Sequence, residues 1–210
     1  MCGIWGFKFT PSYFDKLMEA NVRRGGYSIG FITFGKERVI VKDWQKNWEK
    51  YRDVIRQNVP AFGQFRAPTT DIGEEFVYSE NYPLEYDNVY LFGNGVINAE
   101  YYRKLKKKFG GSNNNDLYYV GLEIIEEGFD ILNDIEGVFA LAMIKVDDKG
   151  QIENVYLMRN TYPLFINDNV YSSAKVSNNM RMLENGIVYD WWNGEVVVRF
   201  KPKEIPFLVM

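Results

Sequence analysis

The residue with the clearest chemical potential is Cys2, the only cysteine in a chain that contains no histidine. Without histidine, a Ser-His-Asp triad, a Cys-His dyad and a histidine general base are all excluded. Removal of Met1 by an aminopeptidase, which a small second residue favours, gives Cys2 a free α-amine. An α-amine has a reference pKa of about 7.7–8.0, so it accepts a proton near neutrality, directly or through one water. One residue then supplies both the nucleophile and the base. The alternative interpretation is that Cys2 is only a small buried hydrophobic residue.

Composition excludes several other classes of function. A lone cysteine forms no internal disulfide, and together with the absence of histidine it leaves no visible metal site, so we expect no metal and no cofactor. Lys and Arg total 25 against 28 Asp and Glu, giving a net charge of -3, so we expect no nucleic-acid partner. The basic run at 103–108 fits a solvated helix face. No apolar run approaches the roughly 20 residues of a membrane span, so we expect no membrane partner and a cytoplasmic location.

The pattern of apolar residues predicts strands at both ends of the chain with helices between them. Helical spacing is expected in 12–24, with Ser12 as N-cap, and in 45–58, 98–109 and 115–132, the last capped by Asn115 or Asp116. Strands are predicted within 2–9, 27–35, 36–44, 60–70, 88–98, 137–148, 153–160, 164–174 and 186–200. We expect Gly93, Asn94 and Gly95 to break the strand at 88–98, and the WNGE sequence to form a hairpin tip. Periodicity alone indicates a layered α+β domain.

The opening MCGIWGF resembles the amino-terminal signature of the class II glutamine amidotransferases, a family that includes asparagine synthetase and glutamine phosphoribosylpyrophosphate amidotransferase. Further resemblances follow in order along almost the whole chain. RRGGYSIGFI resembles the family's Arg-Gly-Pro-Asp-Ser-x-Gly turn, FGQFRAPTT its Gly-His-x-Arg segment and LFGNGVIN its His-Asn-Gly-x-Ile-x-Asn segment. The stretches 113–144 and 157–174 resemble its Ser-Asp-Thr-Glu helix with the following strand and its Arg-Asp-x-x-Gly-x-x-Pro-Leu-Tyr segment. Six ordered matches behind Cys2 make a strong signal.

The resemblance implies a fold and a reaction. It implies an N-terminal-nucleophile αββα four-layer sandwich with two mainly antiparallel sheets, formed by residues 1–210 as a single domain. It also implies that Cys2 attacks the side-chain amide of L-glutamine, forms a γ-glutamyl thioester and releases ammonia. We see no synthase domain in this chain, so we expect the ammonia to be consumed by a synthetase on another chain.

Position by position, the resemblance also implies roles for other residues. Asn94 and the backbone N–H of Gly95 match the donors to the oxyanion, and Arg66 matches the arginine that binds the α-carboxylate of glutamine. Asp116 matches the carboxylate that binds the α-ammonium group. The segment Arg24, Gly25 and Gly26 matches a supporting turn beside the nucleophile.

Each of these residues also has an ordinary structural reading. Asn94-Gly95 is a common turn dipeptide, Asp116 a helix N-cap and Arg66 a surface arginine at a strand end. The family match favours the functional readings of Arg66, Asn94 and Gly95, and also that of Asp116.

The chain departs from the family pattern at several positions. Gln64 stands where many members have His, Tyr27 replaces an acidic residue, Val96 replaces a polar one, and the segment after Arg159 is shorter. A neutral hydrogen-bonding side chain at 64 is structurally compatible with the site.

These departures leave three hypotheses for the function. The first is a glutaminase that supplies a synthetase, the second a stand-alone amidohydrolase for glutamine, a γ-glutamyl compound or another small amide, and the third a non-catalytic binding or regulatory protein. Stimulation of the activity by a partner distinguishes the first two. Retention of Met1 favours the third, because a blocked amine cannot act as the base.

Overall fold

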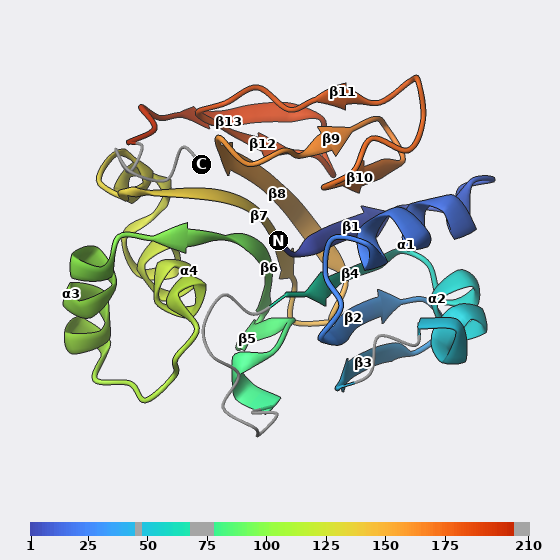
Figure 1. The fold of residues 1–210 in the computed structure, drawn as a ribbon, viewed down its shortest axis with the longest axis horizontal. Helices are drawn as coiled ribbons and strands as arrows, with labels where there is room; N and C mark the ends of the chain where they lie inside the picture. The colour runs from blue at the N-terminus through green and yellow to red at the C-terminus, as the bar shows by residue number, and fades with distance from the viewer. Residues whose placement is uncertain (45–47, 68–77, 204–210) are drawn as a thin grey trace.

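The computed structural model describes residues 1–44, 48–67 and 78–203, and these residues form two β-sheets (Figure 1). Within these ranges the first sheet has seven strands in the order β11-β9-β10-β1-β4-β2-β3, and the second has six in the order β13-β12-β8-β7-β6-β5. Every described pairing between neighbouring strands of a sheet is antiparallel. The strands are β1 (Gly3–Phe7), β2 (Ser28–Phe34), β3 (Arg38–Asp43), β4 (Ala61–Arg66), β5 (Leu84–Tyr86), β6 (Val89–Ile97), β7 (Gly137–Val146), β8 (Ile152–Asn160), β9 (Phe165–Ile166), β10 (Val170–Ser172), β11 (Arg181–Met182), β12 (Ile187–Asp190) and β13 (Glu195–Arg199).

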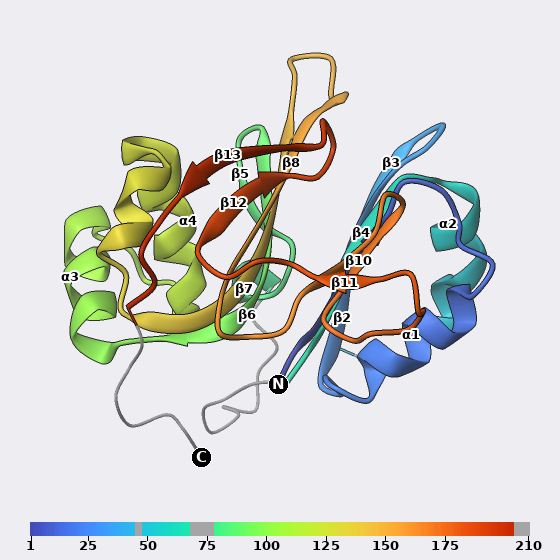
Figure 2. The same cartoon turned by 90° about the horizontal axis from the view of Figure 1, so that it is seen from above.

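The two sheets pack face to face between two layers of helices (Figure 2). Helices α1 (Phe14–Val22) and α2 (Arg52–Gln57) cover the outer face of the first sheet, and α3 (Ala99–Phe109) and α4 (Asp116–Glu127) cover that of the second. Short 3₁₀ helices η1 (Trp48–Tyr51), η2 (Tyr78–Glu80) and η3 (Phe129–Asn133) complete the described elements. The predicted α+β class and the αββα four-layer sandwich with two mainly antiparallel sheets are confirmed.

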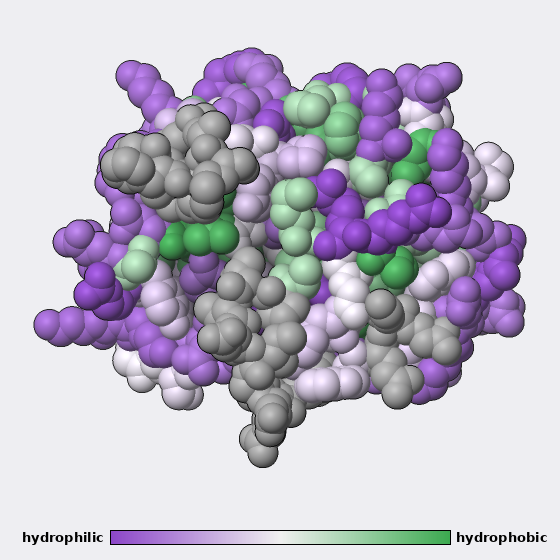
Figure 3. Space-filling model, in the orientation of Figure 1, coloured by the Kyte–Doolittle hydropathy of each residue, from purple (hydrophilic) through white to green (hydrophobic). Residues whose placement is uncertain are grey.

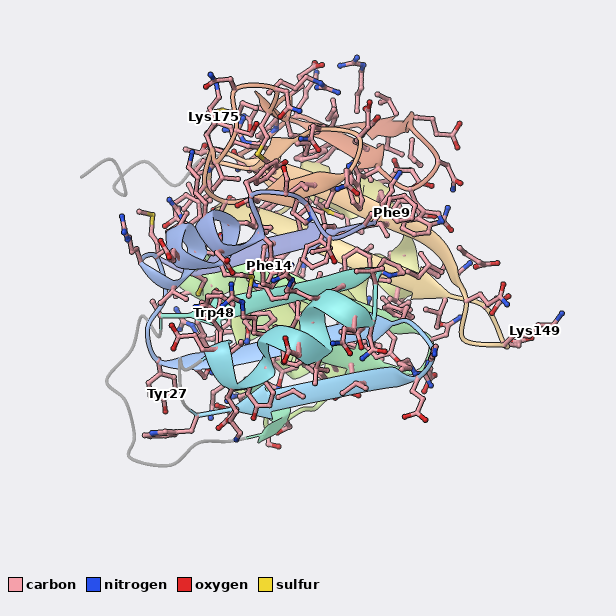
Figure 4. The ribbon with its side chains drawn as sticks, turned by 90° about the vertical axis from the view of Figure 1, so that its right-hand side faces the viewer. Phe9, Phe14, Tyr27, Trp48, Lys149 and Lys175 are labelled. Atoms are coloured by element: carbon pink, nitrogen blue, oxygen red, sulfur yellow. The ribbon has the colours of Figure 1, made fainter. Side chains whose placement is uncertain are left out.

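Side-chain alternation along β1 divides the core into two parts. Ile4 packs between the two sheets, whereas Trp5 and Phe7 point to the opposite face, beneath the helices α1 and α2. There the ring of Phe14 from α1 meets Trp48 edge-on at 5.7 Å between centroids (Figure 4). Strand β1 is therefore buried on both faces, and this packing holds its amino-terminal end, which follows Cys2, in place.

The helix ends correct one prediction and resolve another. Helix α1 begins after Tyr13, which caps it without a side-chain hydrogen bond, so the predicted cap at Ser12 is wrong. Asn115 caps α4 by accepting a hydrogen bond from the N–H of Leu117, so Asp116 is the first residue inside that helix. Asn98 caps α3 in the same way.

The predicted break in the strand at 88–98 is also wrong. Strand β6 runs without interruption from Val89 to Ile97 and pairs in register with β7 throughout. The predicted helix at 45–58 instead begins as the 3₁₀ turn η1 and becomes α-helical only at Arg52. Residues 45–47 of that segment and the predicted turn at 68–70 lie outside the described residues.

Both predicted hairpins are present: β2 pairs with β3, and β12 with β13 around the WNGE sequence. In the orientation of Figure 1, the surface is mainly hydrophilic, with small separate hydrophobic patches (Figure 3). Of the helices in the described ranges, none is long and apolar enough to cross a lipid bilayer.

Candidate active site

Cys2 lies at the amino-terminal end of β1, on the side of the strand that faces the second sheet. Its backbone N–H donates a hydrogen bond to Oδ1 of Asn94 over 3.1 Å, and its residue is only 9% exposed. The thiol contacts the backbone of Ala67, whose N–H lies 3.4 Å and whose carbonyl oxygen lies 3.6 Å from Sγ. Met1, in contrast, is 62% exposed. The thiol is therefore held inside the protein while the residue before it projects outward.

The environment of the thiol has opposing effects on its acidity. Burial raises the pKa of the Cys2 thiol, and this effect is the largest. The backbone hydrogen bond of Ala67, the positive charges of Arg66 and the N-terminus, and a side-chain hydrogen bond from Gln64 each lower the same pKa. Because the net shift is upward, Cys2 is a thiol near neutral pH, and a nearby base is required to activate it.

Asn94 presents an unpaired donor in this buried region. Its Oδ1 accepts the hydrogen bond from Cys2, but its Nδ2 finds no acceptor among the described residues, and the residue is 3% exposed. A buried polar group without a partner costs about 1–3 kcal/mol, so such groups mark positions that need explanation. An unpaired amide donor on a side chain that is hydrogen-bonded to Cys2 is chemically suited to bind a negatively charged oxygen.

The backbone of β6 supplies a second donor. In an antiparallel strand, alternate residues direct their N–H groups to opposite edges. The N–H groups of Gly93 and Ile97 point away from β7, to Gln64 and Asp116 respectively. By alternation the N–H of Gly95 points to the same edge, where β6 has no strand neighbour beyond Leu91 among the described residues. Gly95 is needed here, because a Cβ at this position lies only 2.7 Å from Cβ of Phe139.

Arg66 lies at the end of β4, next to the position of Cys2 on the neighbouring strand β1. Its NH1 group donates to the carbonyl oxygen of Glu80 and to Oδ1 of Asn81, at 3.2 and 3.1 Å. These two contacts orient the guanidinium group. Arg66 lowers the pKa of both Cys2 and Asp116, so its charge acts on both groups.

Asp116 is the first residue of α4. Its two oxygens accept hydrogen bonds from the N–H groups of Ile97 and Leu117, each at 2.9 Å. Burial raises the pKa of its carboxyl, and those backbone hydrogen bonds and Arg66 oppose that shift. The cationic Arg66 and the acidic Asp116 therefore offer complementary charges to a zwitterionic ligand.

The predicted supporting turn lies directly beside Cys2. Nε of Arg24 donates to the carbonyl oxygen of Cys2 over 3.5 Å. Gly25 packs so closely on β4 that an added Cβ falls 2.0 Å from the carbonyl oxygen of Phe65, so only glycine fits. Gly26 is exposed. The structure thus places Arg24 and Asn94 in hydrogen-bonding contact with Cys2 and packs Gly25 on β4. Gly95 lies next to Asn94 in β6, and the charge of Arg66 acts on both Cys2 and Asp116.

The structure also places residues here that the sequence analysis did not identify as site residues. Tyr82 is buried, its hydroxyl donates to Oδ1 of Asn115 over 3.4 Å, and burial with the charges of Cys2 and Asp116 raises its pKa. Ala67 contacts the thiol only through its backbone, which no sequence pattern reveals. Asn115 was visible as a helix cap, but Tyr82 had no recognisable signal.

The departures from the family pattern have different structural settings. The ring of Tyr27 packs against Trp44 at 4.9 Å, at the end of the sandwich opposite the β7–β8 turn that carries Lys149 (Figure 4). Arg159 donates to the backbone carbonyl oxygens of Thr161, Tyr162 and Leu183, so it stabilises the following loop. Val96 is half-buried in β6.

Two stacked antiparallel sheets between helix layers, with Cys2 at the amino-terminal end of a central strand, define the N-terminal-nucleophile hydrolase sandwich. The solved structure of glutamine phosphoribosylpyrophosphate amidotransferase from B. subtilis, complexed with ADP and GMP, matches this chain with a TM-score of 0.65 and 17% identity. A structure of the allosteric regulatory enzyme of purine biosynthesis matches with a TM-score of 0.69 and 18% identity. Both matches cover 95% of this chain and 49% of the other, so this chain spans about half the length of the matched chains.

At these identities the matches show the fold. They agree with the fold that the class II glutamine amidotransferase resemblance implies. No protein-family model and no curated protein sequence matches the chain.

Proposed function

We propose that this protein is a glutaminase of the class II amidotransferase type that hydrolyses the side-chain amide of L-glutamine through Cys2. The observation that carries the proposal is the buried Nδ2 of Asn94, which has no partner among the described residues and belongs to the side chain whose Oδ1 accepts the N–H of Cys2. Together with the N–H of Gly95, it forms a pair of donors of the kind that stabilises a tetrahedral oxyanion. Cys2, Asn94 and Gly95 are the proposed catalytic groups.

The proposed reaction begins after Met1 is removed. The α-amine of Cys2 accepts the thiol proton, directly or through water, and Sγ forms a bond to the side-chain carbonyl carbon of glutamine. Collapse of the tetrahedral intermediate breaks the C–N bond, and the proton held by the amine passes to the departing nitrogen, which leaves as ammonia. Water then attacks the thioester, giving glutamate and restoring the thiol. The hydrogen bond to Oδ1 of Asn94 orients the amine in this sequence.

Substrate selection follows from the charges on either side of the thiol. Arg66 binds the α-carboxylate with its planar guanidinium, and Asp116 binds the α-ammonium group. A ligand that satisfies both is a free amino acid and not a residue within a peptide. Arg24, Gly25 and Gly26 support the carbonyl and strand next to the nucleophile.

The test is the intact mass of the purified protein before and after treatment with 6-diazo-5-oxo-norleucine, a glutamine-analogue electrophile. The proposal expects loss of Met1, one adduct located at Cys2, and ammonia release from glutamine. The Cys2→Ala variant is the matched control and should show neither adduct nor ammonia. Retained Met1, or a processed chain that stays unlabelled even with candidate partner proteins, refutes the glutaminase and leaves a binding protein or an enzyme for a different amide.

We further propose that residues 1–210 act as one glutaminase domain whose ammonia is consumed by a synthetase on another chain. The support is that the two matched chains, one of them an amidotransferase, are about twice as long as the region of shared fold. Glutamine hydrolysis that increases when the partner and its acceptor are added supports this arrangement. Full activity without any partner favours the stand-alone amidohydrolase.

A further inference from the structure

A feature of the site that the proposed chemistry does not use is the side chain of Gln64. Gln64 belongs to β4 in the first sheet and is 1% exposed. Its Nε2 donates to the carbonyl oxygen of Gly93 over 2.7 Å, and its Oε1 accepts from the N–H of the same residue over 2.9 Å. Gly93 belongs to β6 in the second sheet, so one carboxamide joins the two sheets.

These two hydrogen bonds satisfy Gly93 at an edge of β6 where a neighbouring strand would otherwise do so. The pairing of β5 with β6 ends at Leu84 and Leu91, which leaves the following edge of β6 without a strand neighbour among the described residues. An unpaired, buried strand edge is costly, because each N–H and C=O group loses its water. The Gln64 carboxamide presents one donor and one acceptor, as a peptide group does, and satisfies both polar groups of Gly93.

The position of Gln64 connects this contact to the nucleophile. Gln64 lies opposite Ile4 in the pairing of β4 with β1, two residues along the strand from Cys2. Gly93 immediately precedes Asn94, and Gly95 follows. The carboxamide therefore ties β4, the strand hydrogen-bonded to the one that carries the thiol, to β6, the strand that carries both oxyanion donors.

A second side chain holds the same edge of β6 beyond the donors. Asp116 accepts a hydrogen bond from the N–H of Ile97, so the N–H of Gly95 lies between two positions of this edge, Gly93 and Ile97, whose N–H groups have side-chain acceptors. Of these two side chains, Gln64 and Asp116, only Gln64 comes from the sheet that contains β1, the strand that follows Cys2. A displacement of about 1 Å in a catalytic group can reduce a rate about 100-fold, so such a tie has kinetic consequences.

We infer that Gln64 is a positioning residue, which fixes the distance between the Cys2 thiol and the oxyanion donors Asn94 and Gly95 by holding both polar groups of Gly93. The expected effect of Gln64 on catalysis rests on the proposed glutaminase function. The contact with Gly93 itself is independent of any substrate.

The test uses Gln64→Met, which keeps the side-chain length and removes both hydrogen bonds to Gly93. It also removes the Gln64 hydrogen bond that lowers the pKa of Cys2, so the alkylation rates below are compared at their high-pH limit. Gln151→Met, the same change at an exposed turn, is the matched control. For Gln64→Met we expect kcat for glutamine to fall about 10- to 100-fold while KM stays within about 3-fold, because the donors are displaced but Arg66 and Asp116 remain. The Gly93 amide should exchange with deuterium at least 10 times faster.

Two further measurements separate positioning from general disruption. Iodoacetamide alkylates a thiolate without an oxyanion hole, so its limiting rate at high pH should stay within about 3-fold of wild type. In combination with Asn94→Ala, the loss of kcat should be smaller than the product of the two single losses, because both changes disable the same donors.

Several outcomes overturn the inference. Wild-type kcat in Gln64→Met, multiplicative losses in the double variant, or a collapse of the alkylation rate each exclude a positioning role. Unchanged exchange at Gly93 excludes the tie between the sheets. A wild-type protein that releases no ammonia instead refutes the proposed function and the catalytic consequence with it, while the exchange experiment still decides whether Gln64 holds Gly93.

Discussion

Replacement of Asn94 tests the proposed oxyanion site most directly, because Asn94 makes two separable contacts. Its Oδ1 accepts from the backbone N–H of Cys2, and its buried Nδ2 has no acceptor among the described residues. Asn94→Ala removes both functions. Asn94→Asp keeps an oxygen for Cys2 but replaces the donor with a second carboxylate oxygen, which repels a developing oxyanion.

The size of the effect follows from these contacts. Loss of one oxyanion donor reduces kcat by roughly 100- to 1,000-fold, or about 2.7–4 kcal/mol of transition-state stabilisation. We expect Asn94→Ala to lie in this range and Asn94→Asp to be less active still. Folding stability should change little in Asn94→Ala. The variant leaves the N–H of Cys2 without its acceptor, which costs about 1–3 kcal/mol, but it also removes an unpaired buried donor whose cost is of the same size.

The assay measures ammonia release from glutamine at saturating substrate, together with urea denaturation and iodoacetamide labelling of Cys2. Labelling should continue in both variants, since direct alkylation forms no oxyanion. If Asn94→Ala keeps kcat within about 3-fold of wild type while Cys2 remains essential, Asn94 does not stabilise the transition state and the proposed oxyanion site is wrong.

Two further substitutions test the binding group and the supporting turn. Arg66→Met should raise KM for glutamine about 10- to 100-fold, since charge-assisted hydrogen bonds contribute about 1.5–3 kcal/mol. Because Arg66 lowers the pKa of Cys2, its loss should move the pH profile of iodoacetamide labelling to higher pH. Arg66→Lys keeps the positive charge but not the planar guanidinium, so it should restore the pH profile more fully than it restores the KM for glutamine. Gly25→Ala should lower the free energy of unfolding by about 3 kcal/mol or more, at or above the upper end for overpacking, because its Cβ meets the Phe65 backbone. Gly110→Ala, in open space at φ 64°, should lower it by only about 1–2 kcal/mol; equal effects in urea denaturation contradict the close packing at Gly25.

The layer architecture was predictable because the apolar pattern and the ordered family resemblances indicate the same elements. The helix over Phe14, Leu17 and Met18 follows from their spacing, and the hairpin after Asp190 from its turn sequence. The strand break predicted at Gly93–Gly95 failed for a physical reason. Local glycine preference is overridden by pairing with β7 and by side chains that satisfy the opposite edge of the strand.

Parts of the site could not be predicted because they depend on backbone groups and on contacts across the sandwich. The sequence shows that Asn94 precedes a glycine, but the unpaired state of its Nδ2 appears only when β6 lies against β1. Likewise, Ala67 touches the thiol through its main chain. Tyr82 reaches the site from a segment that had no recognised motif.

The absence of histidine links these observations. In the proposed reaction, the Cys2 thiol is activated by a group that titrates near neutral pH, and the α-amine that removal of Met1 would release meets this requirement. The amide side chains around it, Asn94 and Gln64, do not titrate, so they hold and orient the reacting groups at any pH. The pH dependence of the reaction should therefore report the amine and the thiol, while the geometry of the site is set by neutral hydrogen bonds between the two sheets.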